Sequence, residues 1–405
     1  MIPLAKPDVG FQEIEEVTKV LKSGILSLGP KIRNFEQSFA SHIGTKYAVG
    51  VNSGTSGLHL AVRSLNLKEG DEVITTPFSF IASSNCLLYE DVTPVFVDVE
   101  EESFNIDPSK IEAAITKNTK ALLIAHIFGQ SCNMTQIMKI AKKYNLKIIE
   151  DACESIDAVH YNQKTGTFGD VAVFAFYPNK QMTTGEGGMV SSNIEEIVDI
   201  ARSFAWWGRD CYCVGPANLL PKGTCKNRFD KWLPEVNAVI DHKYLFSNIG
   251  YNLKPLDMQG AVGIEQLNKI DEIHRLRRLH KKIIANYISS YIEGVRVVEE
   301  HKQAETSWFG VPIVCDTANI KENLVKHLEN NKIQTRSYFA GNILLHPAYK
   351  NLDNASNYPI ANSVLENVFF IGCSPTYSSN MLDYIKSVLL KFKSNNINVI
   401  TDNTE

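Results

Sequence analysis

The sequence predicts an α/β protein: a mostly parallel central sheet with helices on both faces, followed by a smaller α+β domain. The first observation is that short β-rich runs alternate with helix-like segments through the first two-thirds of the chain. This is the order expected of a parallel sheet covered by helices. The second observation is composition. The 405 residues are 44% hydrophobic and 21% charged, as in ordinary globular proteins, and this length suits two domains.

The alternating elements follow one another in a regular order along the chain. Apolar residues at helical spacing predict helices at residues 11–22, 57–67, 107–116 and 134–145. Runs rich in β-branched residues predict strands at 46–51, 71–76, 93–99, 119–126 and 146–151. Ligands of such folds gather at the carboxyl ends of the strands, so we expect the functional residues in the loops that follow them.

The regular order ends with an irregular segment. Residues 207–246 are rich in Gly, Pro, Cys and Asn and have no sustained periodicity, and a stretch of that length inside a compact chain is usually functional. A helical pattern then covers residues 261–292, and short strands are expected near 307–314 and 334–337. We therefore expect a large domain at 1–255, with the irregular insert at 207–246, and a small C-terminal domain at 256–405.

Charge and hydropathy exclude several classes of partner. The 41 basic residues against 45 acidic ones give a net charge of −4, which leaves no electrostatic footprint for nucleic acid or an anionic membrane. No apolar run is long enough to span a bilayer, and the first residues lack the basic-then-apolar order of a signal peptide. The eight cysteines are too sparse for a disulfide scaffold. We expect a cytoplasmic protein.

Three features of the large domain bear on chemistry. The run NSGTSGL at 52–58 lies between a predicted strand and a predicted helix. Backbone N–H groups at a helix N-terminus suit a phosphate, although a tight turn with a Ser or Thr cap has the same sequence. Asp151 closes the strand at 146–151, where it either faces a ligand cleft or caps a helix. Lys180 stands in a loop between aromatic residues and the glycine-rich run GEGG at 185–188.

Together these features match the needs of a pyridoxal phosphate enzyme. The lysine amine forms the Schiff base, the carboxylate keeps the pyridine nitrogen protonated as an electron sink, and the turn holds the phosphate. Lys180, Asp151 and residues 52–58 supply one group of each kind. Taken singly, each also has a plain structural interpretation: a solvated lysine, a helix cap and a tight turn.

Several runs of sequence resemble the DegT/DnrJ/EryC1/StrS family, in the family's order, from about residue 2 to about residue 390. They are GP at 29–30, NSGTSGL at 52–58, GDEVI at 70–74, EDACES at 150–155, GTFGD at 166–170, Lys180 with GEGG at 185–188, and GYNLKPLDMQ at 250–259. Members of that family are pyridoxal phosphate-dependent sugar aminotransferases with the type I, or aspartate aminotransferase, fold. The resemblance therefore implies that fold, that cofactor, and nucleotide-sugar and amino-acid substrates.

The resemblance also implies roles for individual residues. Lys180 would be the Schiff-base lysine and proton shuttle, and Asp151 would pair with the pyridinium nitrogen. Gly54 and Thr55 would bind the cofactor phosphate. Five residues before the lysine the family usually has a serine that binds the phosphate, and Ala175 lacks that hydroxyl. One donor must therefore come from elsewhere, or the cofactor is held less tightly.

Three further positions complete the site that the resemblance implies. Phe80, in the run TPFSF at 76–80, matches the aromatic residue that stacks on the cofactor ring. Glu154 lies where the family places a polar group near the cofactor's phenolic oxygen. Asn252 matches an asparagine that reaches the phosphate of the neighbouring subunit's cofactor, which implies a homodimer with shared active sites.

The insert is similar to that of the iron–sulfur sugar 3-dehydrases of the same family. The similar runs are WGRDCYC at 207–213, CKNRF at 225–229, DHKY at 241–244 and, in the small domain, FAGNI at 339–343. By this resemblance Cys153, Cys211, Cys213 and Cys225 would hold a [2Fe–2S] cluster, which needs four thiolates. The gap between Cys213 and Cys225 is longer than in the family, and four cysteines could also bind zinc or nothing.

The insert also carries an excess of basic residues: Arg209, Lys222, Lys226, Arg228 and Lys231. We expect them to line the substrate entrance, where they would suit a nucleotide diphosphate through charge-assisted hydrogen bonds.

Lys180 decides the order of the functional hypotheses. The iron–sulfur dehydrases have histidine at this position, so that the cofactor is not recaptured and a C–O bond can be cleaved. A lysine can return the proton and release an amino product. We therefore expect an enzyme that moves an amino group from an amino acid, glutamate above all, to a nucleotide-linked keto sugar. The alternatives are an iron–sulfur sugar dehydrase or deoxygenase, and a catalytically inactive binding protein on the same fold.

Overall fold

The computed structural model describes residues 1–211, 228–230, 232–339 and 341–401, with side chains up to residue 393. Its largest sheet has seven strands. Their order is β1-β9-β8-β5-β4-β2-β3. Neighbouring strands from β8 to β3 are parallel, whereas β9 is antiparallel to both β8 and β1. The strands are β1 Tyr47–Val51, β2 Glu72–Thr75, β3 Thr93–Phe96, β4 Thr119–Ala125, β5 Lys147–Asp151, β8 Val171–Ala175 and β9 Gly188–Ser192. The mostly parallel sheet predicted from the sequence is confirmed.

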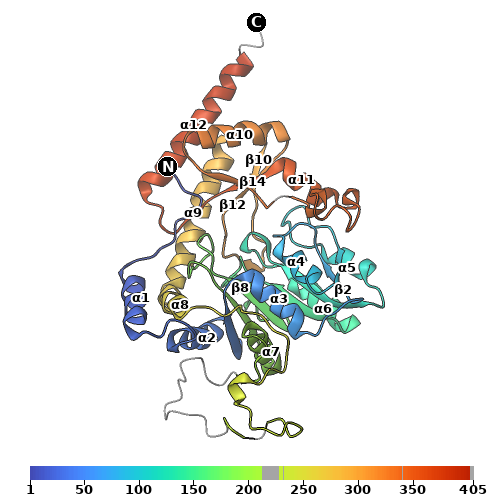
Figure 1. Ribbon diagram of the computed structural model, residues 1–405. Coiled ribbons are helices and arrows are strands. Elements are labelled where there is room, and N and C mark those ends of the chain that lie inside the picture. The colour runs from blue at the N-terminus through green and yellow to red at the C-terminus, as the bar shows by residue number, and fades with distance from the viewer. Residues whose placement is uncertain (212–227, 231, 340, 402–405) are drawn as a thin grey trace.

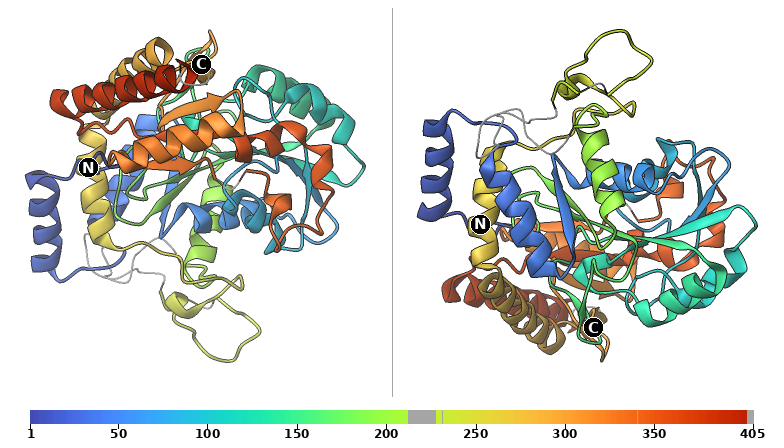
Figure 2. Two further views of the ribbon diagram at one scale, coloured as in Figure 1. Left: turned by 90° about the horizontal axis from the view of Figure 1, so that it is seen from above. Right: turned by 90° about the horizontal axis from the view of Figure 1, so that it is seen from below.

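Both faces of this sheet are buried, as β8 illustrates. Val171 and Val173 pack in one apolar cluster with helices on one face, and Ala172 and Phe174 pack in another on the opposite face. Strands buried on both faces are apolar almost throughout, rather than alternating with polar residues. The first face is covered by α3 Gly54–Ser64, α4 Ala82–Leu88 and α7 Glu195–Ala205, and the second by α2 Pro30–Ile43, α5 Pro108–Ala114 and α6 Met134–Tyr144 (Figures 1 and 2).

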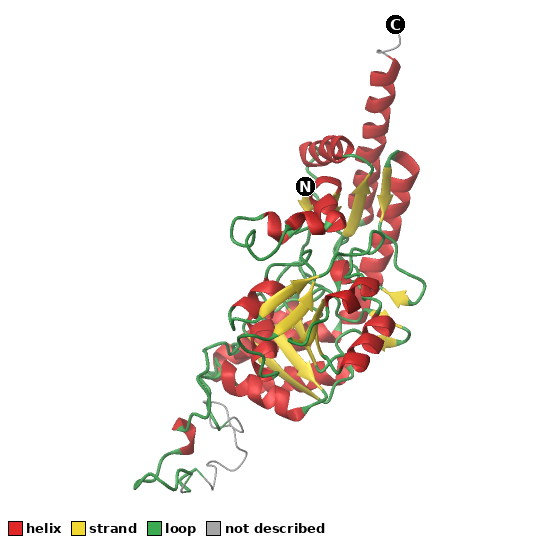
Figure 3. Ribbon diagram, turned by 90° about the vertical axis from the view of Figure 1, so that its right-hand side faces the viewer, coloured by secondary structure: helices red, strands yellow, loops and turns green. Residues whose placement is uncertain are grey.

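A second, antiparallel sheet lies above the first in Figures 1 and 3. Its four strands run in the order β10-β12-β14-β13 and comprise Val295–Val297, Val311–Cys315, Val368–Ile371 and Thr335–Ser337, respectively. The helices around it are α9 Ile270–Tyr291, α10 Ala318–Asn330, α11 Pro359–Asn367 and α12 Ser379–Thr401. A small third sheet joins β11 Ala304–Glu305 to β6 Val159–His160 and β7 Gln163–Lys164. The boundary between residues 255 and 256 stays a prediction.

The helical pattern predicted at residues 261–292 forms two helices. These are α8 Asp257–Asn268 and α9, and Lys269 between them has φ −115° and ψ 12°. The α8 helix packs against α2 and α1 (Phe11–Ser23), whereas α9 continues towards the second sheet (Figure 1). Lys269 Nζ lies 2.7 Å from Glu13 Oε1 at this break. Glu13 is distant from Lys269 in the sequence, so the local periodicity of residues 261–292 could not predict the break between α8 and α9.

The described parts of the irregular segment contain little regular structure. A short 3₁₀ helix at His242–Tyr244 is present, and an isolated bridge joins Arg209 to Phe246. The other 3₁₀ helices are Ile127–Gly129, Ile343–Leu345 and Ala355–Asn357. Over the described part of the chain, no helix combines the length and apolar character that crossing a membrane requires.

Candidate active site

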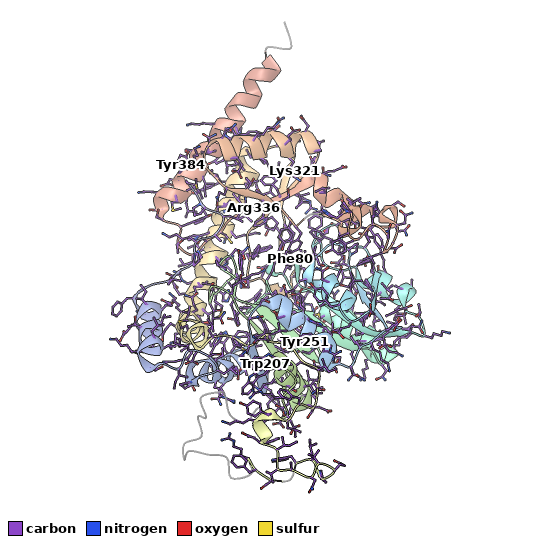
Figure 4. All side chains as sticks on the ribbon, in the orientation of Figure 1. Phe80, Trp207, Tyr251, Lys321, Arg336 and Tyr384 are labelled. Atoms are coloured by element: carbon purple, nitrogen blue, oxygen red, sulfur yellow. The ribbon has the colours of Figure 1, made fainter. Side chains whose placement is uncertain are left out.

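A cavity of about 570 Å³ lies at the carboxyl ends of the parallel strands β4, β5 and β8. Its other side is closed by Phe309 and by residues 336–339, which belong to the four-stranded sheet and its loops. In Figure 4, Arg336, which belongs to β13 of the four-stranded sheet, lies above Phe80, and both residues line the cavity. The positions singled out in the sequence that meet in this cavity are Gly54, Thr55, Phe80, Asp151, Cys153, Glu154, Ala175 and Lys180.

One end of the cavity meets the N-terminus of α3. Ser53 caps this helix, because its Oγ accepts a hydrogen bond of 3.1 Å from the Ser56 N–H. The N–H groups of Gly54 and Thr55 belong to the first turn and have no intrahelical acceptor. The helix dipole there favours an anion. A Cβ at Gly54 would lie only 2.7 Å from the Ala175 Cβ, so glycine is required for β8 to approach the helix end this closely.

Asp151 is the last residue of β5, and its carboxylate is held at two points. Oδ2 accepts a hydrogen bond of 2.6 Å from Ser83 Oγ, and Oδ1 accepts one of 3.2 Å from the Cys153 N–H. The following residues, 152–158, form turns that lead into β6. The alternative in which Asp151 caps a helix is therefore excluded, and its carboxylate faces the cavity.

Lys180 lies in the loop between β8 and β9, and its amine faces a carboxylate. Nζ lies 3.1 Å from Glu154 Oε1 in an ion pair and 4.8 Å from the centre of the Phe309 ring. The second oxygen, Glu154 Oε2, accepts a hydrogen bond from the Tyr338 hydroxyl. Burial, together with the nearby carboxylate of Glu154, raises the pKa of Tyr338 well above its usual value, so this hydroxyl stays protonated and remains a donor.

The donor set of the cavity fits pyridoxal phosphate. Asp151 offers a carboxylate for the pyridine nitrogen, Lys180 a primary amine, and the N-terminus of α3 an anion site. Phe80, which is 55% exposed at the cavity, offers a flat apolar ring. Asn179 Oδ1 lines the same wall and is buried without a hydrogen-bond partner among the described residues. An acceptor of this kind requires a donor from a ligand or water.

Asn252 lies outside this cavity. Its backbone pairs with Trp206, and its Oδ1 accepts a hydrogen bond from Lys254, whose ammonium lies 3.8 Å from the centre of the Trp207 ring. In Figure 4, Trp207 and Tyr251 lie well below Phe80. The expected contact of Asn252 with a neighbouring subunit's cofactor stays a prediction.

Two of the four cysteines expected to bind metal can be placed. Cys153 lines the cavity, and the pKa of its thiol is well above the usual value because burial and the Asp151 charge disfavour the thiolate. Cys211 is buried at the start of the insert. Cys213 and Cys225 lie outside the described residues. Among the described residues, no group of three or more His, Cys, Asp or Glu could hold a metal ion, and these residues give the predicted iron–sulfur cluster no support.

The basic residues of the insert that are described do not line the cavity wall. The Arg209 guanidinium lies 4.7 Å from the centre of the Trp206 ring. Arg228 donates to the carboxylate of Asp241, with 2.8 Å between Nε and Oδ1. The expectation of a basic substrate entrance is therefore not met by these two residues, and Lys222, Lys226 and Lys231 lie outside the described residues.

Sequence reasoning missed two residues that hold the site together. Ser83 orients Asp151, and Tyr338 holds Glu154. Nothing in the local sequence marks Ser83 as a partner of a distant strand end. Tyr338 directly precedes the run FAGNI at 339–343, so that run was the available signal that this part of the chain approaches the site.

The fold, the cavity and the donor set are those of a pyridoxal phosphate-dependent enzyme. The chain belongs to the DegT/DnrJ/EryC1/StrS aminotransferase family, whose model matches residues 7–390. The predicted family, fold and pyridoxal phosphate cofactor are thereby confirmed. So is the prediction that the protein is an enzyme, which sets aside the alternative of an inactive binding protein.

The similar proteins include sugar 3-dehydratases and GDP-perosamine synthases. Over 379 residues the chain is 35% identical to the dTDP-4-dehydro-2,6-dideoxy-D-glucose 3-dehydratase of Saccharopolyspora spinosa, covering 91% of this chain and 81% of that protein. Over 394 residues it is 32% identical to the GDP-perosamine synthase of Escherichia coli O157:H7, covering 97% and 99%. The solved structure of E. coli GDP-4-keto-6-deoxy-D-mannose-3-dehydratase with bound hydrated PLP has a TM-score of 0.83 at 28% identity, covering 96% and 99%.

Proposed function

We propose that this enzyme transfers an amino group from an amino acid, with glutamate as the first candidate, to a keto sugar carried on a nucleotide. The observation that carries the proposal is the Lys180 amine in the cavity wall, which also contains Asp151. A primary amine at this place can hold the cofactor covalently and can deliver a proton to the substrate. The histidine of the dehydrases has no such nucleophilic amine.

The other residues of the wall would hold and tune the cofactor. Asp151 would pair with the pyridine nitrogen, and Phe80 would cover one face of the ring. Glu154 would lie near the phenolic oxygen. Bound pyridoxal phosphate supplies an electron sink for the carbon that loses its proton. Lys180, held 3.1 Å from Glu154, is the group that takes and returns this proton.

The phosphate would bind at the N-terminus of α3. The N–H groups of Gly54 and Thr55 would donate to the phosphate, and the helix dipole would add to its electrostatic attraction. Ala175 lies beside Gly54 and offers no hydroxyl. The remaining donor would come from Asn252 of a second subunit.

A homodimer with shared active sites is therefore part of the proposal. Large apolar side chains at positions near Asn252 in the sequence are exposed: Ile249 is 91% and Leu256 45% exposed. Trp207, whose ring lies against Lys254, is 40% exposed. Exposed apolar side chains of this size favour contact with another protein. Sedimentation should detect a dimer, and Ile249→Asp should weaken both the dimer and cofactor binding. A wild-type monomer that binds the cofactor fully would contradict this part.

A second candidate is removal of the hydroxyl group at C3 of a nucleotide keto sugar. It is favoured by the similarity to 3-dehydratases, including the two named above. In the iron–sulfur form of this candidate, Cys153, Cys211, Cys213 and Cys225 would hold a [2Fe–2S] cluster. Iron and sulfide analysis of the purified protein, compared with a Cys211→Ser/Cys213→Ser variant, tests this form. We place the enzyme in the cytoplasm, which the sparse use of cysteine favours.

The deciding experiment incubates the cofactor-loaded enzyme with a panel of nucleotide-linked keto sugars and glutamate. Amination replaces the carbonyl oxygen of the sugar with an amino group and yields 2-oxoglutarate, and mass spectrometry of the sugar product detects this change. Isotopic nitrogen in the glutamate should appear in the sugar. A deoxy sugar without the nitrogen label would contradict amination and support the second candidate.

A further inference from the structure

Tyr338 connects the two large sheets at the carboxylate partner of Lys180. Tyr338 follows β13 of the four-stranded sheet, and Glu154 follows β5 of the seven-stranded sheet. The Tyr338 hydroxyl donates to Glu154 Oε2 and accepts a hydrogen bond of 2.8 Å from the Phe128 N–H. Both contacts are buried, and Tyr338 is 1% exposed. The hydroxyl is thus oriented by one donor and one acceptor on the opposite side of the cavity.

Aromatic rings fix the position of this hydroxyl. The centre of the Tyr338 ring lies 3.6 Å from that of Phe128, 4.4 Å from that of Phe339 and 5.4 Å from that of Phe370. A donor that is already ordered loses little entropy when it bonds to a carboxylate. In a buried site a charge-assisted hydrogen bond is also stronger than a neutral one.

The two oxygens of Glu154 face different partners. Oε1 faces the Lys180 ammonium at 3.1 Å, and Oε2 faces Tyr338. Before Lys180 can act as a nucleophile, its amine must lose a proton. At that moment Glu154, which is 7% exposed, loses its charged partner while it stays buried. A buried carboxylate without partners is costly, and among the described residues Tyr338 is the side-chain donor that remains.

We propose that Tyr338 is a positioning residue that keeps the Glu154 carboxylate ionised and in place when Lys180 gives up its proton. The inference rests on the proposed role of Lys180 as the cofactor-binding lysine. Glu154 and Tyr338 then act in opposite directions. The carboxylate favours the charged form of the lysine. The tyrosine stabilises the carboxylate after the lysine has lost its charge.

The test measures the reactivity of Lys180 in cofactor-free protein as a function of pH. A short pulse of acetic anhydride is followed by mass spectrometry of the peptide that contains Lys180, with the exposed Lys143 as an internal reference. In Tyr338→Phe the profile of Lys180 should move to higher pH, because the carboxylate then has no donor other than the charged lysine to rely on. In Glu154→Gln it should move to lower pH.

The double variant separates positioning from a general loss of structure. Tyr338 acts only through the carboxylate, so Glu154→Gln/Tyr338→Phe should give the profile of Glu154→Gln alone. The matched control is Tyr358→Phe, because Tyr358 is also buried and donates to a carboxylate, that of Asp353, outside the cavity wall. Its profile should equal that of the wild type. The other titratable groups of the cavity wall are the same in every variant: His126, Asp151, Cys153, Tyr177, Glu186 and Arg336.

An unchanged profile in folded Tyr338→Phe would overturn the inference, and so would a double variant that differs from Glu154→Gln. A Glu154→Gln profile that fails to move to lower pH would also overturn it, because it removes the carboxylate from the scheme. The measurement uses protein without cofactor. A failure of Lys180 to bind pyridoxal phosphate would therefore be seen separately, in the absorption of the loaded wild type and Lys180→Ala.

Discussion

The Ser83 hydroxyl donates a hydrogen bond of 2.6 Å to Asp151 Oδ2 and so fixes the rotation of the carboxylate at the end of β5. The other oxygen, Oδ1, accepts the Cys153 N–H at 3.2 Å. Both partners belong to the chain itself, so the carboxylate is ordered before a ligand arrives. An ion pair whose geometry is set in advance needs no reorganisation during the reaction.

Asp151→Asn should leave the cofactor bound but reduce turnover by roughly a hundredfold or more, because a neutral amide cannot stabilise a protonated pyridine nitrogen. The amide oxygen can still accept from Ser83, so the fold should be unchanged. Steady-state kinetics and cofactor absorption measure the two effects. The control is Asp170→Asn, because the Asp170 carboxylate pairs with Lys147 outside the cavity wall. Near-wild-type turnover of Asp151→Asn would leave the carboxylate with a structural role only.

Lys180→Ala should abolish both the absorption of covalently bound cofactor and amino transfer, because the variant has no primary amine at that position. The substitution removes an ion pair but creates no clash, so we expect a folded protein. Circular dichroism and the absorption spectrum provide the check. Lys143→Ala, which removes an exposed lysine paired with Glu112, should behave as the wild type. Amino transfer by Lys180→Ala would disprove the assignment.

Ala175→Ser should tighten the binding of pyridoxal phosphate. The position lies beside Gly54 in the cavity wall, so a hydroxyl there can donate to the phosphate. One hydrogen bond to a charged group corresponds to roughly a tenfold lower dissociation constant. Equilibrium titration of the cofactor-free protein measures it. Ala175→Cys, with a side chain of similar size and a weak donor, should change affinity far less, and equal effects of the two would point to packing instead.

Acid should destabilise the fold through His160. Burial lowers the pKa of His160 to about 4, and neighbouring His301 and His126 add to the effect. The unfolded chain therefore binds a proton on this histidine from about pH 6.5 downwards, while the folded chain resists it until about pH 4. This stability is present above pH 6.5 and is lost as the pH falls towards 4.

The loss between pH 7 and pH 4.5 should be about 2 kcal/mol for this group. Urea unfolding of the wild type and of His160→Gln at the two pH values measures the contribution. The variant has no titrating ring at this position, so its stability should fall less over the same interval. Identical losses in the two proteins would show that His160 does not contribute to the acid sensitivity.

Much of the fold follows from local sequence. The β-branched runs of the first two-thirds of the chain lie within a few residues of β1 to β5, because strands buried on both faces must be apolar throughout. The break at Lys269 could not be found in this way. Lys269 is neither Gly nor Pro, and its ion pair with Glu13 depends on how distant helices pack.

The same distinction applies to the site. Asp151 and Lys180 are visible in the sequence because Asp151 ends a recognisable strand and Lys180 shortly precedes the glycine-rich run at 185–188. That they meet in one cavity with Gly54 and Phe80 follows from the parallel order of the strands. The partner of Glu154 could not be predicted, because Tyr338 is 184 residues further along the chain and reaches it only after the two sheets have packed.

That separation has a consequence for how the enzyme matures in the cell. At roughly 5–20 residues per second of translation, Tyr338 leaves the ribosome roughly 10–40 s after Glu154. Lys180 emerges from the ribosome early in this interval. The residues that close the other side of the cavity emerge only later. Capture of pyridoxal phosphate in the closed cavity must therefore follow synthesis of the last strands, up to Phe370, which also lines the wall. A chain stalled before residue 338 would present a reactive amine with no pocket around it.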